Sequence, residues 1–350
     1  MKKIKLLLHV GYAKTATTWM RRQVFPCLNN SIHFNDSDSF DRTLVCRELY
    51  KTHFQLFQPL YSLKHYQARN SENLIRRYVD ILEREIRQRF VNSNDISCFI
   101  LSAGAVIEYS NYNGELNQFL LYRAMKRLRE NLSNYCVLEI SILVVFREQA
   151  SSLQSFYAQD YNRQKDRFPT LEKFLDYGIK NHHDITFGSL WYDEIFHNLR
   201  DLFREDNLIF VPYELLVEDP FLFLEKSIGH LGNTDLKKLL STALLKKEKV
   251  SRDVSGANKL KEPSFTSRVI GKLSMKYKGL IPERYQDSVK SMRDLFVKRF
   301  GGHVLKGGVK INNEQRKMIQ DLYRDSNTRL AEMISVDLDR FGYAVNKDIT

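Results

Sequence analysis

The chain has 350 residues, 43% of them hydrophobic and 12% aromatic, which favours a folded protein with a large buried core. Lysine and arginine outnumber aspartate and glutamate by 54 to 42, and the net charge of +12 favours an anionic partner. Because these basic residues are spread over many segments, nucleic acid is not the expected partner. The four cysteines lie far apart and match no metal-ligand spacing. With no apolar run as long as a membrane span and no signal peptide, we expect a cytoplasmic protein without a transmembrane segment.

Apolar runs alternate with amphipathic stretches along the chain. Four runs predict buried strands, at 4–10, 96–102, 137–146 and 207–212. Helical patterns follow at about 15–28, 71–90, 115–132, 148–159, 171–179, 190–203, 220 onward and 234–247, whereas 29–42 has the composition of a loop. This alternation predicts an α/β fold with a parallel sheet of about four to five strands, covered by helices on both faces. We expect one domain over 1–350, with insertions at about 29–95 and 160–200 and a helical tail at about 265–350.

The first predicted strand runs directly into a cluster of small polar residues before a helix begins. Gly11 ends the apolar run, and Lys14 is followed by three threonines, Thr15, Thr17 and Thr18. A helix that begins where a strand ends presents free backbone N–H groups, and a lysine and hydroxyls at that point complete an anion site. The alternative is an ordinary turn whose threonines only cap the helix. The sequence favours a phosphate-binding loop, because capping alone requires neither the lysine nor three hydroxyls.

This loop differs from the nucleotide-binding loop of kinases and ATPases. That motif places its lysine after a second glycine, but Lys14 comes three residues after Gly11 and Ala16 stands in place of a glycine. The run from Lys14 to Trp19, Lys-Thr-Ala-Thr-Thr-Trp, resembles the 5′-phosphosulfate loop of sulfotransferases that use 3′-phosphoadenosine-5′-phosphosulfate. The resemblance implies a P-loop-type sheet, with Lys14 as catalytic and cofactor-binding residue. It also implies cofactor contacts by Thr15, Ala16, Thr17, Thr18 and Trp19.

A second signal lies at the end of the third predicted strand. Arg147 follows the apolar run directly, and Ser155 comes eight residues later. A kinase would place a metal-binding aspartate at such a strand end, whereas an arginine binds phosphate oxygens through its planar fork. The spacing is similar to the 3′-phosphate motif of the same sulfotransferases, which implies that Arg147 and Ser155 bind that phosphate. Singly, each residue is as easily explained by a salt bridge or by a serine facing solvent.

Smaller matches and departures accompany these motifs. Tyr213 begins a Tyr-Glu stretch similar to one in the family, with Leu at position 215 where Asp is usual, and the resemblance places Tyr213 near the adenine. The late basic stretch of the cytosolic branch is absent, so Arg252 is a candidate cofactor ligand in its place. The catalytic base is unassigned between Glu108 and His53. Because parallel strands end at one edge, we expect the Gly11–Thr18 loop, Ser102, Arg147 and Tyr213 to converge there, with His9 facing inward.

The resemblance implies transfer of a sulfuryl group from 3′-phosphoadenosine-5′-phosphosulfate to a hydroxyl or amine, without a metal. Adenosine 3′,5′-bisphosphate would be the second product, and a glycan or small molecule the acceptor. Two alternatives remain open at this point. One is a phosphotransferase of the kinase type, and the other is a non-catalytic protein that binds polyanions, which the net charge alone would permit.

Overall fold

The structure is a computed structural model. It describes residues 2–12, 15–34, 48–49, 52, 56–57, 71–92, 98–102, 117–204, 207–232, 235–244, 261–262, 303–304 and 309–346. The strands are β1 (Lys3–His9), β2 (Ser31–Phe34), β3 (Cys98–Ser102), β4 (Val137–Phe146), β5 (Asn207–Pro212), β6 (Lys261–Glu262) and β7 (His303–Val304). The α-helices are α1 (Thr17–Trp19), α3 (Ser71–Asn92), α4 (Asn117–Leu132), α5 (Gln149–Gln164), α6 (Leu171–Lys180), α7 (Ile185–Gly188), α8 (Tyr192–Leu202), α9 (Tyr213–Glu218), α10 (Pro220–Ile228), α11 (Leu236–Leu244) and α14 (Asn313–Ile334).

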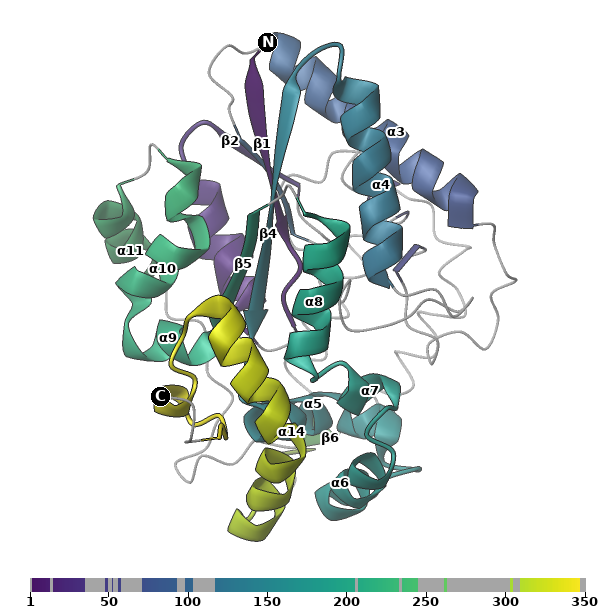
Figure 1. The fold of residues 1–350 in the computed structure, drawn as a ribbon, viewed down its shortest axis with the longest axis vertical. Helices are drawn as coiled ribbons and strands as arrows, with labels where there is room; N and C mark the ends of the chain where they lie inside the picture. Colours follow the sequence, from purple (N-terminus) through teal and green to yellow (C-terminus); the bar gives the residue numbers. More distant parts are fainter. Residues whose placement is uncertain are drawn as a thin grey trace. The chain divides into compact units, whose positions relative to one another are not determined.

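Five strands form one parallel sheet in the order β2-β3-β1-β4-β5 (Figure 1). Strand β1 therefore lies at the centre, between β3 and β4. The remaining strands, β2 and β5, form the two edges. Since all five strands run in the same direction, their carboxyl ends meet at one edge. The predicted fold class, an α/β fold with a parallel sheet between helices, is confirmed.

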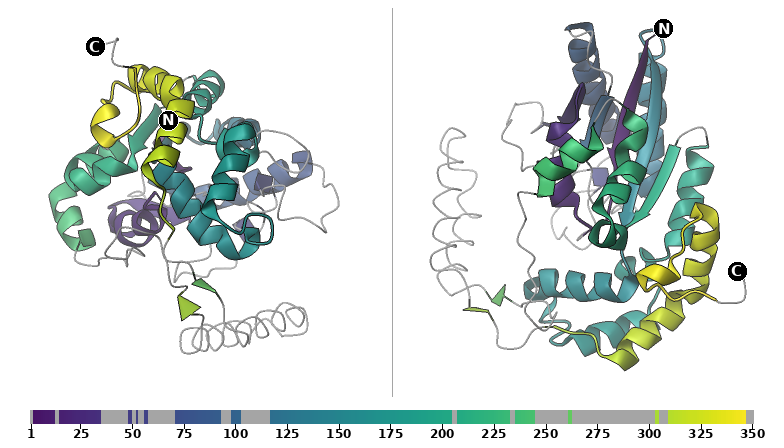
Figure 2. Two further views of the ribbon diagram at one scale, coloured as in Figure 1. Left: turned by 90° about the horizontal axis from the view of Figure 1, so that it is seen from below. Right: turned by 90° about the vertical axis from the view of Figure 1, so that its left-hand side faces the viewer.

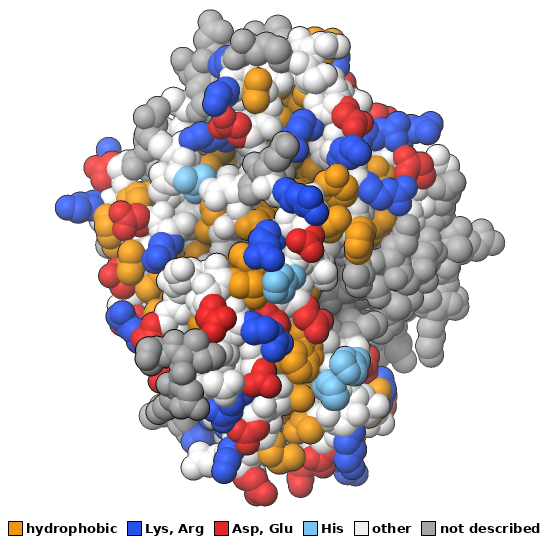
Figure 3. All heavy atoms as spheres, viewed as in Figure 1, with side chains coloured by type: hydrophobic (Ala, Val, Ile, Leu, Met, Phe, Trp, Pro, Cys, Tyr) orange, Lys and Arg blue, Asp and Glu red, His pale blue; other side chains and the backbone are white. Residues whose placement is uncertain are grey.

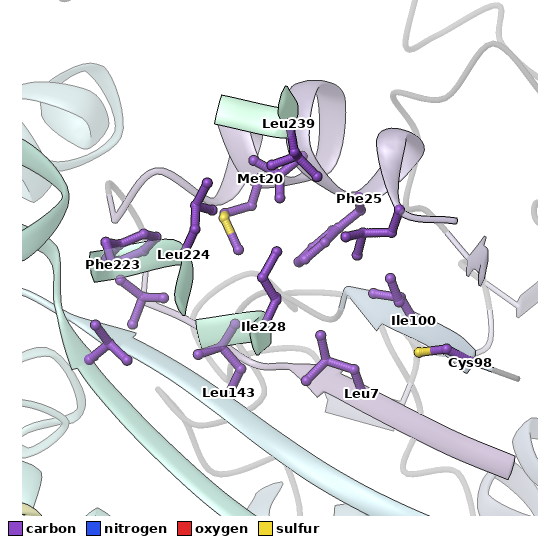
Figure 4. Close-up of a cluster of buried hydrophobic side chains, with 14 of the residues drawn as sticks. Leu7, Met20, Phe25, Cys98, Ile100, Leu143, Phe223, Leu224, Ile228 and Leu239 are labelled. Atoms are coloured by element: carbon purple, nitrogen blue, oxygen red, sulfur yellow. The ribbon is translucent and has the colours of Figure 1, made fainter. Parts of the chain in front are cut away.

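Helices cover both faces of this sheet (Figures 1 and 2). Alternation along β1 sends Leu7 to the face covered by the helical segment after β1 and by α10 and α11. The core on that face, shown in Figure 4, includes Leu7, Met20, Phe25, Ile100, Leu143, Phe223, Leu224, Ile228 and Leu239. On the opposite face Phe146 and Phe210 contact aromatic side chains of α8, Tyr192 and Phe196 respectively. The central strands are buried over most of their length, including residues 6–8 of β1 and 140–146 of β4, because helices cover both faces there.

Most predicted boundaries match the structure closely. Strands β4 and β5 have the predicted bounds, and α10 begins as its sequence indicates. Asp219 is its N-cap and accepts a hydrogen bond of 2.9 Å from the Leu222 N–H, with Pro220 at the first helical position. The helix predicted at 15–28 is present as a composite, in which α1 is followed by a π-helical turn over Met20–Val24 and a 3-10 turn over Phe25–Cys27.

The prediction of a loop over 29–42 was wrong in part, because Ser31–Phe34 forms β2 at the edge of the sheet. The segment is only four residues long and lies between Asn and Asp residues, so its composition hides the strand. Its stabilising contact is distant in sequence. Phe34 is buried and stacks on Phe99 of β3, with ring centroids 5.8 Å apart.

The chain divides into two compact units. The first comprises 1–152, 177–248 and 316–350 and contains the five-stranded sheet, and the second comprises 153–176 and 249–315. In the second unit the described side chains of α5 and α6 form an aromatic cluster, in which the Tyr157 hydroxyl donates a 2.9 Å hydrogen bond to the Phe168 carbonyl and Phe174 packs against both rings. That the whole of 1–350 acts as one domain stays a prediction.

None of the helices in the described part of the chain is both long and apolar enough to cross a membrane. Blue basic and red acidic side chains are interspersed on the face shown in Figure 3. Among the described residues, some charged side chains pair between neighbouring helices, such as Arg127 of α4 and Glu72 of α3 at 2.8 Å. The face in Figure 3 thus carries charges of both signs.

Candidate functional site

The predicted loop begins beside the end of β4. The chain stays paired with β4 beyond β1, because the Val10 N–H donates to the Leu143 carbonyl at 3.0 Å and the Tyr12 N–H donates to the Val145 carbonyl at 3.2 Å. Arg147 comes two residues after Val145. The start of the loop and the arginine therefore lie on neighbouring strands at the same edge of the sheet.

Ala16 carries the backbone turn from which the first helix starts. Its φ of 59° and ψ of 16° lie in the left-handed region, and its carbonyl accepts a 2.9 Å hydrogen bond from the Met20 N–H. An L-residue with a Cβ is strained in this conformation, and glycine is not. Ala16 therefore stands at a position where the backbone conformation favours glycine.

The loop threonines have different roles in the structure. Thr15 is fully buried and donates a 2.6 Å hydrogen bond to the Tyr12 carbonyl, and Thr17 donates to the same carbonyl at 3.3 Å. These two hydroxyls stabilise the turn itself. Thr18 is partly exposed, and its hydroxyl makes no hydrogen bond to any other described residue. Of the three, Thr18 has the hydroxyl that is ready to contact a ligand.

Arg147 and Tyr213 lie together, as the convergence of parallel strands predicts. Arg147 is only 6% exposed, and its guanidinium carbon lies 5.0 Å from the centroid of the Tyr213 ring. The backbone of Arg147 is held from the opposite face, because the Tyr192 hydroxyl donates a 2.7 Å hydrogen bond to its carbonyl. Tyr192 also contacts Tyr12 edge to face at 5.0 Å. The arginine at the end of β4 is thus fixed against an aromatic ring at the end of β5.

Two acidic side chains next to these residues serve the local structure. Glu148 follows Arg147, and its carboxylate accepts hydrogen bonds from the Ala150 and Ser151 N–H groups at the start of α5. It also forms a 2.8 Å ion pair with Arg316. Glu214 accepts a 3.1 Å hydrogen bond from the Glu148 N–H. Burial raises the pKa of Glu214, while the backbone N–H groups and the nearby Arg147 charge act in the opposite direction.

The C-terminal helix and the residues after it attach to this strand end. The Tyr343 hydroxyl donates a 2.9 Å hydrogen bond to Glu214, and burial raises the pKa of Tyr343. The side chains of Gln149 and Asn327 bond to each other through both their oxygen and nitrogen atoms, at 2.6 and 3.3 Å. No sequence pattern indicated these partners, because each pair joins residues more than a hundred positions apart.

A histidine and a serine meet at the ends of β1 and β3. His9 is fully buried, and its Nδ1 lies 2.9 Å from the Ser102 hydroxyl. Phe25 contacts the rings of both His9 and His33 edge to face at 5.2 Å. Burial lowers the pKa of His9 to about 3, and the positive charge of Arg21 contributes. His9 faces inward, as predicted, and it is neutral at physiological pH.

Several predicted site residues have no described position. Lys14, His53, Glu108 and Arg252 lie outside the described residues. Ser155 is buried in α5, but it belongs to the second unit, so its role beside Arg147 stays a prediction. Trp19 is partly buried and packs against the core cluster of Figure 4, as Tyr213 also does.

The solved structures that are similar to this chain include two sulfotransferases. A sulfotransferase from Alicyclobacillus acidocaldarius aligns over 96% of this chain and 98% of its own, with 11% identity and a TM-score of 0.48. The sulfotransferase domain from the curacin biosynthetic pathway aligns over 73% of this chain and 82% of its own, with 11% identity and a TM-score of 0.32. No protein-family model and no curated protein matches the chain.

Proposed function

We propose that this protein is a sulfotransferase that moves a sulfuryl group from 3′-phosphoadenosine-5′-phosphosulfate to a hydroxyl or amine. The observation that carries the proposal is the buried Arg147 against the Tyr213 ring, at the sheet edge where the Lys14–Trp19 loop begins. A nucleotide with phosphates on both its 5′ and 3′ carbons needs two anion sites and an aromatic surface for its base. The loop and Arg147 supply the first two, and Tyr213 and Trp19 are the aromatic candidates.

The roles of the loop follow from its composition and geometry. Lys14 would bind the 5′ end and stabilise negative charge on the oxygen that leaves sulfur, together with the Thr18 hydroxyl and the backbone N–H groups of the loop. Thr15, Ala16 and Thr17 would contribute through the backbone, since the two hydroxyls are engaged with Tyr12. The acceptor proton would pass to a base, for which Glu108 and His53 remain the candidates.

The chemistry beside Arg147 favours this function over phosphoryl transfer by a kinase. A kinase-type site requires a carboxylate at a strand end that is available to hold magnesium. The carboxylate of Glu148, the residue after Arg147, accepts hydrogen bonds from two backbone N–H groups and pairs with Arg316. The carboxylate of Glu214 binds the Glu148 N–H and the Tyr343 hydroxyl. We therefore infer that the reaction needs no metal.

The acceptor class is inferred from charge and composition. A protein with a net charge of +12 and aromatic-rich segments at 29–95 and 160–200 suits a glycan, and a small molecule is the second choice. A polyanion-binding protein without activity would share this charge. Such a protein would not require affinity for a nucleotide with a 3′-phosphate, which is the group that we propose Arg147 binds.

A transfer assay tests the proposal. The protein is incubated with 3′-phosphoadenosine-5′-phosphosulfate and a panel of glycans, amines and phenols in the presence of EDTA. Formation of adenosine 3′,5′-bisphosphate and the mass gain of one sulfuryl group on an acceptor are measured. Lys14→Ala should lower turnover about a hundredfold or more, whereas Lys226→Ala, at an exposed position in α10, should not.

Three outcomes would contradict the proposal. Strict dependence on a divalent metal with ATP as donor would indicate a kinase. Salt-sensitive binding of an acidic polymer, without affinity for either nucleotide, would indicate a polyanion-binding protein. Turnover that is equal in the Lys14→Ala and wild-type proteins would remove the loop from the mechanism.

A further inference from the structure

His9 and Ser102 form a hydrogen-bonded pair that has two donor protons, and the bond between the two residues uses only one of them. His9 is 0% exposed and Ser102 is 3% exposed, and Nδ1 lies 2.9 Å from Oγ. A neutral imidazole has one N–H and a serine has one O–H, so the pair holds two protons and shares only one of them. Whichever tautomer His9 adopts, one donor of the pair points away from the shared bond. A buried donor without an acceptor costs stability, so such a group requires explanation.

The second ring nitrogen of His9 faces the start of the loop. Nε2 is buried and has no hydrogen-bond partner among the described residues. A Cβ atom placed on Gly11 would lie 3.4 Å from this Nε2 and 3.3 Å from the Thr15 hydroxyl oxygen. Nε2 thus lies next to Gly11, the first residue of the loop, which has no side chain to separate the two. The other face of the imidazole is closed by Phe25.

The neutral state of His9 suits a hydrogen-bond donor better than a base. Its pKa is lowered to about 3 by burial, by the charge of Arg21 and by His33. The imidazole therefore keeps one N–H donor and one acceptor nitrogen over the physiological range of pH. If Ser102 donates to Nδ1, the remaining proton lies on Nε2 and faces Gly11. If Nδ1 donates instead, the remaining proton lies on the Ser102 hydroxyl at the end of β3.

We propose that the His9–Ser102 pair donates a hydrogen bond to a tetrahedral oxyanion bound at the loop. This inference rests on the proposed function, in which that anion is the 5′-phosphosulfate of the donor nucleotide. The phosphate and the sulfuryl group present the same kind of oxygen, and either accepts the bond. The pair acts through a neutral N–H or O–H, so its contribution does not vary between pH 6 and 8. It is a binding residue pair that the sequence motif does not contain.

Calorimetric titration of nucleotides tests the pair directly. His9→Phe and Ser102→Ala should each weaken binding of adenosine 3′,5′-bisphosphate by roughly five- to tenfold, the value of one neutral hydrogen bond. Binding of adenosine 3′-monophosphate, which has no 5′ anion, should not change. An additional loss for adenosine 5′-phosphosulfate over adenosine 5′-monophosphate would place the contact on the sulfuryl group, and equal losses would place it on the phosphate.

Matched variants control for effects on folding. His33→Phe changes a second histidine that packs against Phe25, and Ser141→Ala changes a buried serine of β4. Both should bind all the nucleotides as the wild-type protein does. Because His9→Phe could fail to fold, a second measurement uses the unaltered protein. The ¹⁵N resonance of His9 Nε2 or Nδ1 should shift on saturation with adenosine 3′,5′-bisphosphate, while that of His33 stays in place.

The results separate this inference from the proposed function. If the wild-type protein binds adenosine 3′,5′-bisphosphate but the His9→Phe and Ser102→Ala variants bind it equally well, the pair has no ligand and the inference is wrong. A His9 resonance that does not respond to the nucleotide has the same meaning, with a buried water as the partner. If the wild-type protein binds no such nucleotide, the proposed function itself fails.

Discussion

Replacement of Arg147 by alanine is the most direct test of the nucleotide site. Arg147 is 6% exposed and lies against the Tyr213 ring, so a phosphate bound there would be largely shielded from water. At an effective dielectric constant of about 20, two unit charges 4 Å apart attract by about 4 kcal/mol, from which desolvation must be subtracted. Loss of one member of such a pair costs about 2–4 kcal/mol. We therefore expect binding of adenosine 3′,5′-bisphosphate to weaken by about 30- to 1000-fold.

The assay is calorimetric titration of two nucleotides against each variant. Adenosine 5′-monophosphate lacks the 3′-phosphate, and its affinity should stay almost unchanged in Arg147→Ala. Arg147→Lys retains the charge but not the planar fork, so its loss should be intermediate. Arg200→Ala removes an exposed arginine of α8 and should affect neither nucleotide.

Glu214 introduces a complication that the measurement can separate. The Arg147 charge opposes the rise in the Glu214 pKa that burial causes, so its removal should raise that pKa further. A carboxyl group with a raised folded-state pKa stabilises the fold below its unfolded-state pKa, and this stability is lost as the pH rises through the folded value. The melting temperature of Arg147→Ala should therefore fall as the pH rises. Equal losses of affinity for both nucleotides would refute the reasoning, because Arg147 would then support the fold or the 5′ end.

Three further predictions concern the loop and the histidine pair. Ala16→Gly should raise the free energy of unfolding by about 0.5–1 kcal/mol in urea, because Ala16 has a φ of 59°; a less stable variant would contradict this. Thr15→Val should lower the free energy of unfolding by about 1–3 kcal/mol, whereas Thr18→Val should weaken nucleotide binding by about 1 kcal/mol. Denaturation and calorimetric titration of both variants test this. A loss of stability in Thr18→Val and a loss of binding in Thr15→Val would contradict the assignment. Because the pKa of folded His9 is about 3, the free energy of unfolding should fall by up to about 4–5 kcal/mol as the pH falls from 6.5 towards 3. In His9→Gln the free energy of unfolding should depend less on pH over this range. An unchanged dependence would mean that another group causes the effect.

Local sequence patterns predicted the elements that position the site. The apolar runs of β4 and β5 end directly before Arg147 and Tyr213, and these two boundaries are visible in the sequence. The proximity of Arg147 and Tyr213 followed from a general property of parallel sheets, since both residues come directly after a strand. That inference required no knowledge of which strands are neighbours.

What the sequence could not predict depends on contacts between distant residues. Strand β2 is stabilised by Phe34 against Phe99, and four residues carry too little pattern to reveal it. The hydroxyls of Thr15 and Thr17 were predicted to bind an anion, but both donate to the Tyr12 carbonyl. Composition predicts that hydroxyls are present. It does not predict which acceptor each one reaches.

The attachment of the C-terminal residues to the strand end has a consequence for synthesis of the protein. All five strands of the sheet and Glu214 leave the ribosome before Asn327 and Tyr343, which complete the hydrogen bonds around Gln149 and Glu214. Until then, the nascent chain contains all five strands, but the carboxylate of Glu214 lacks the Tyr343 hydroxyl. Contacts across such sequence distances form late and slowly. A chain truncated within α14 would therefore keep the residues of all five strands but lack the buried Tyr343, which binds Glu214 beside Arg147.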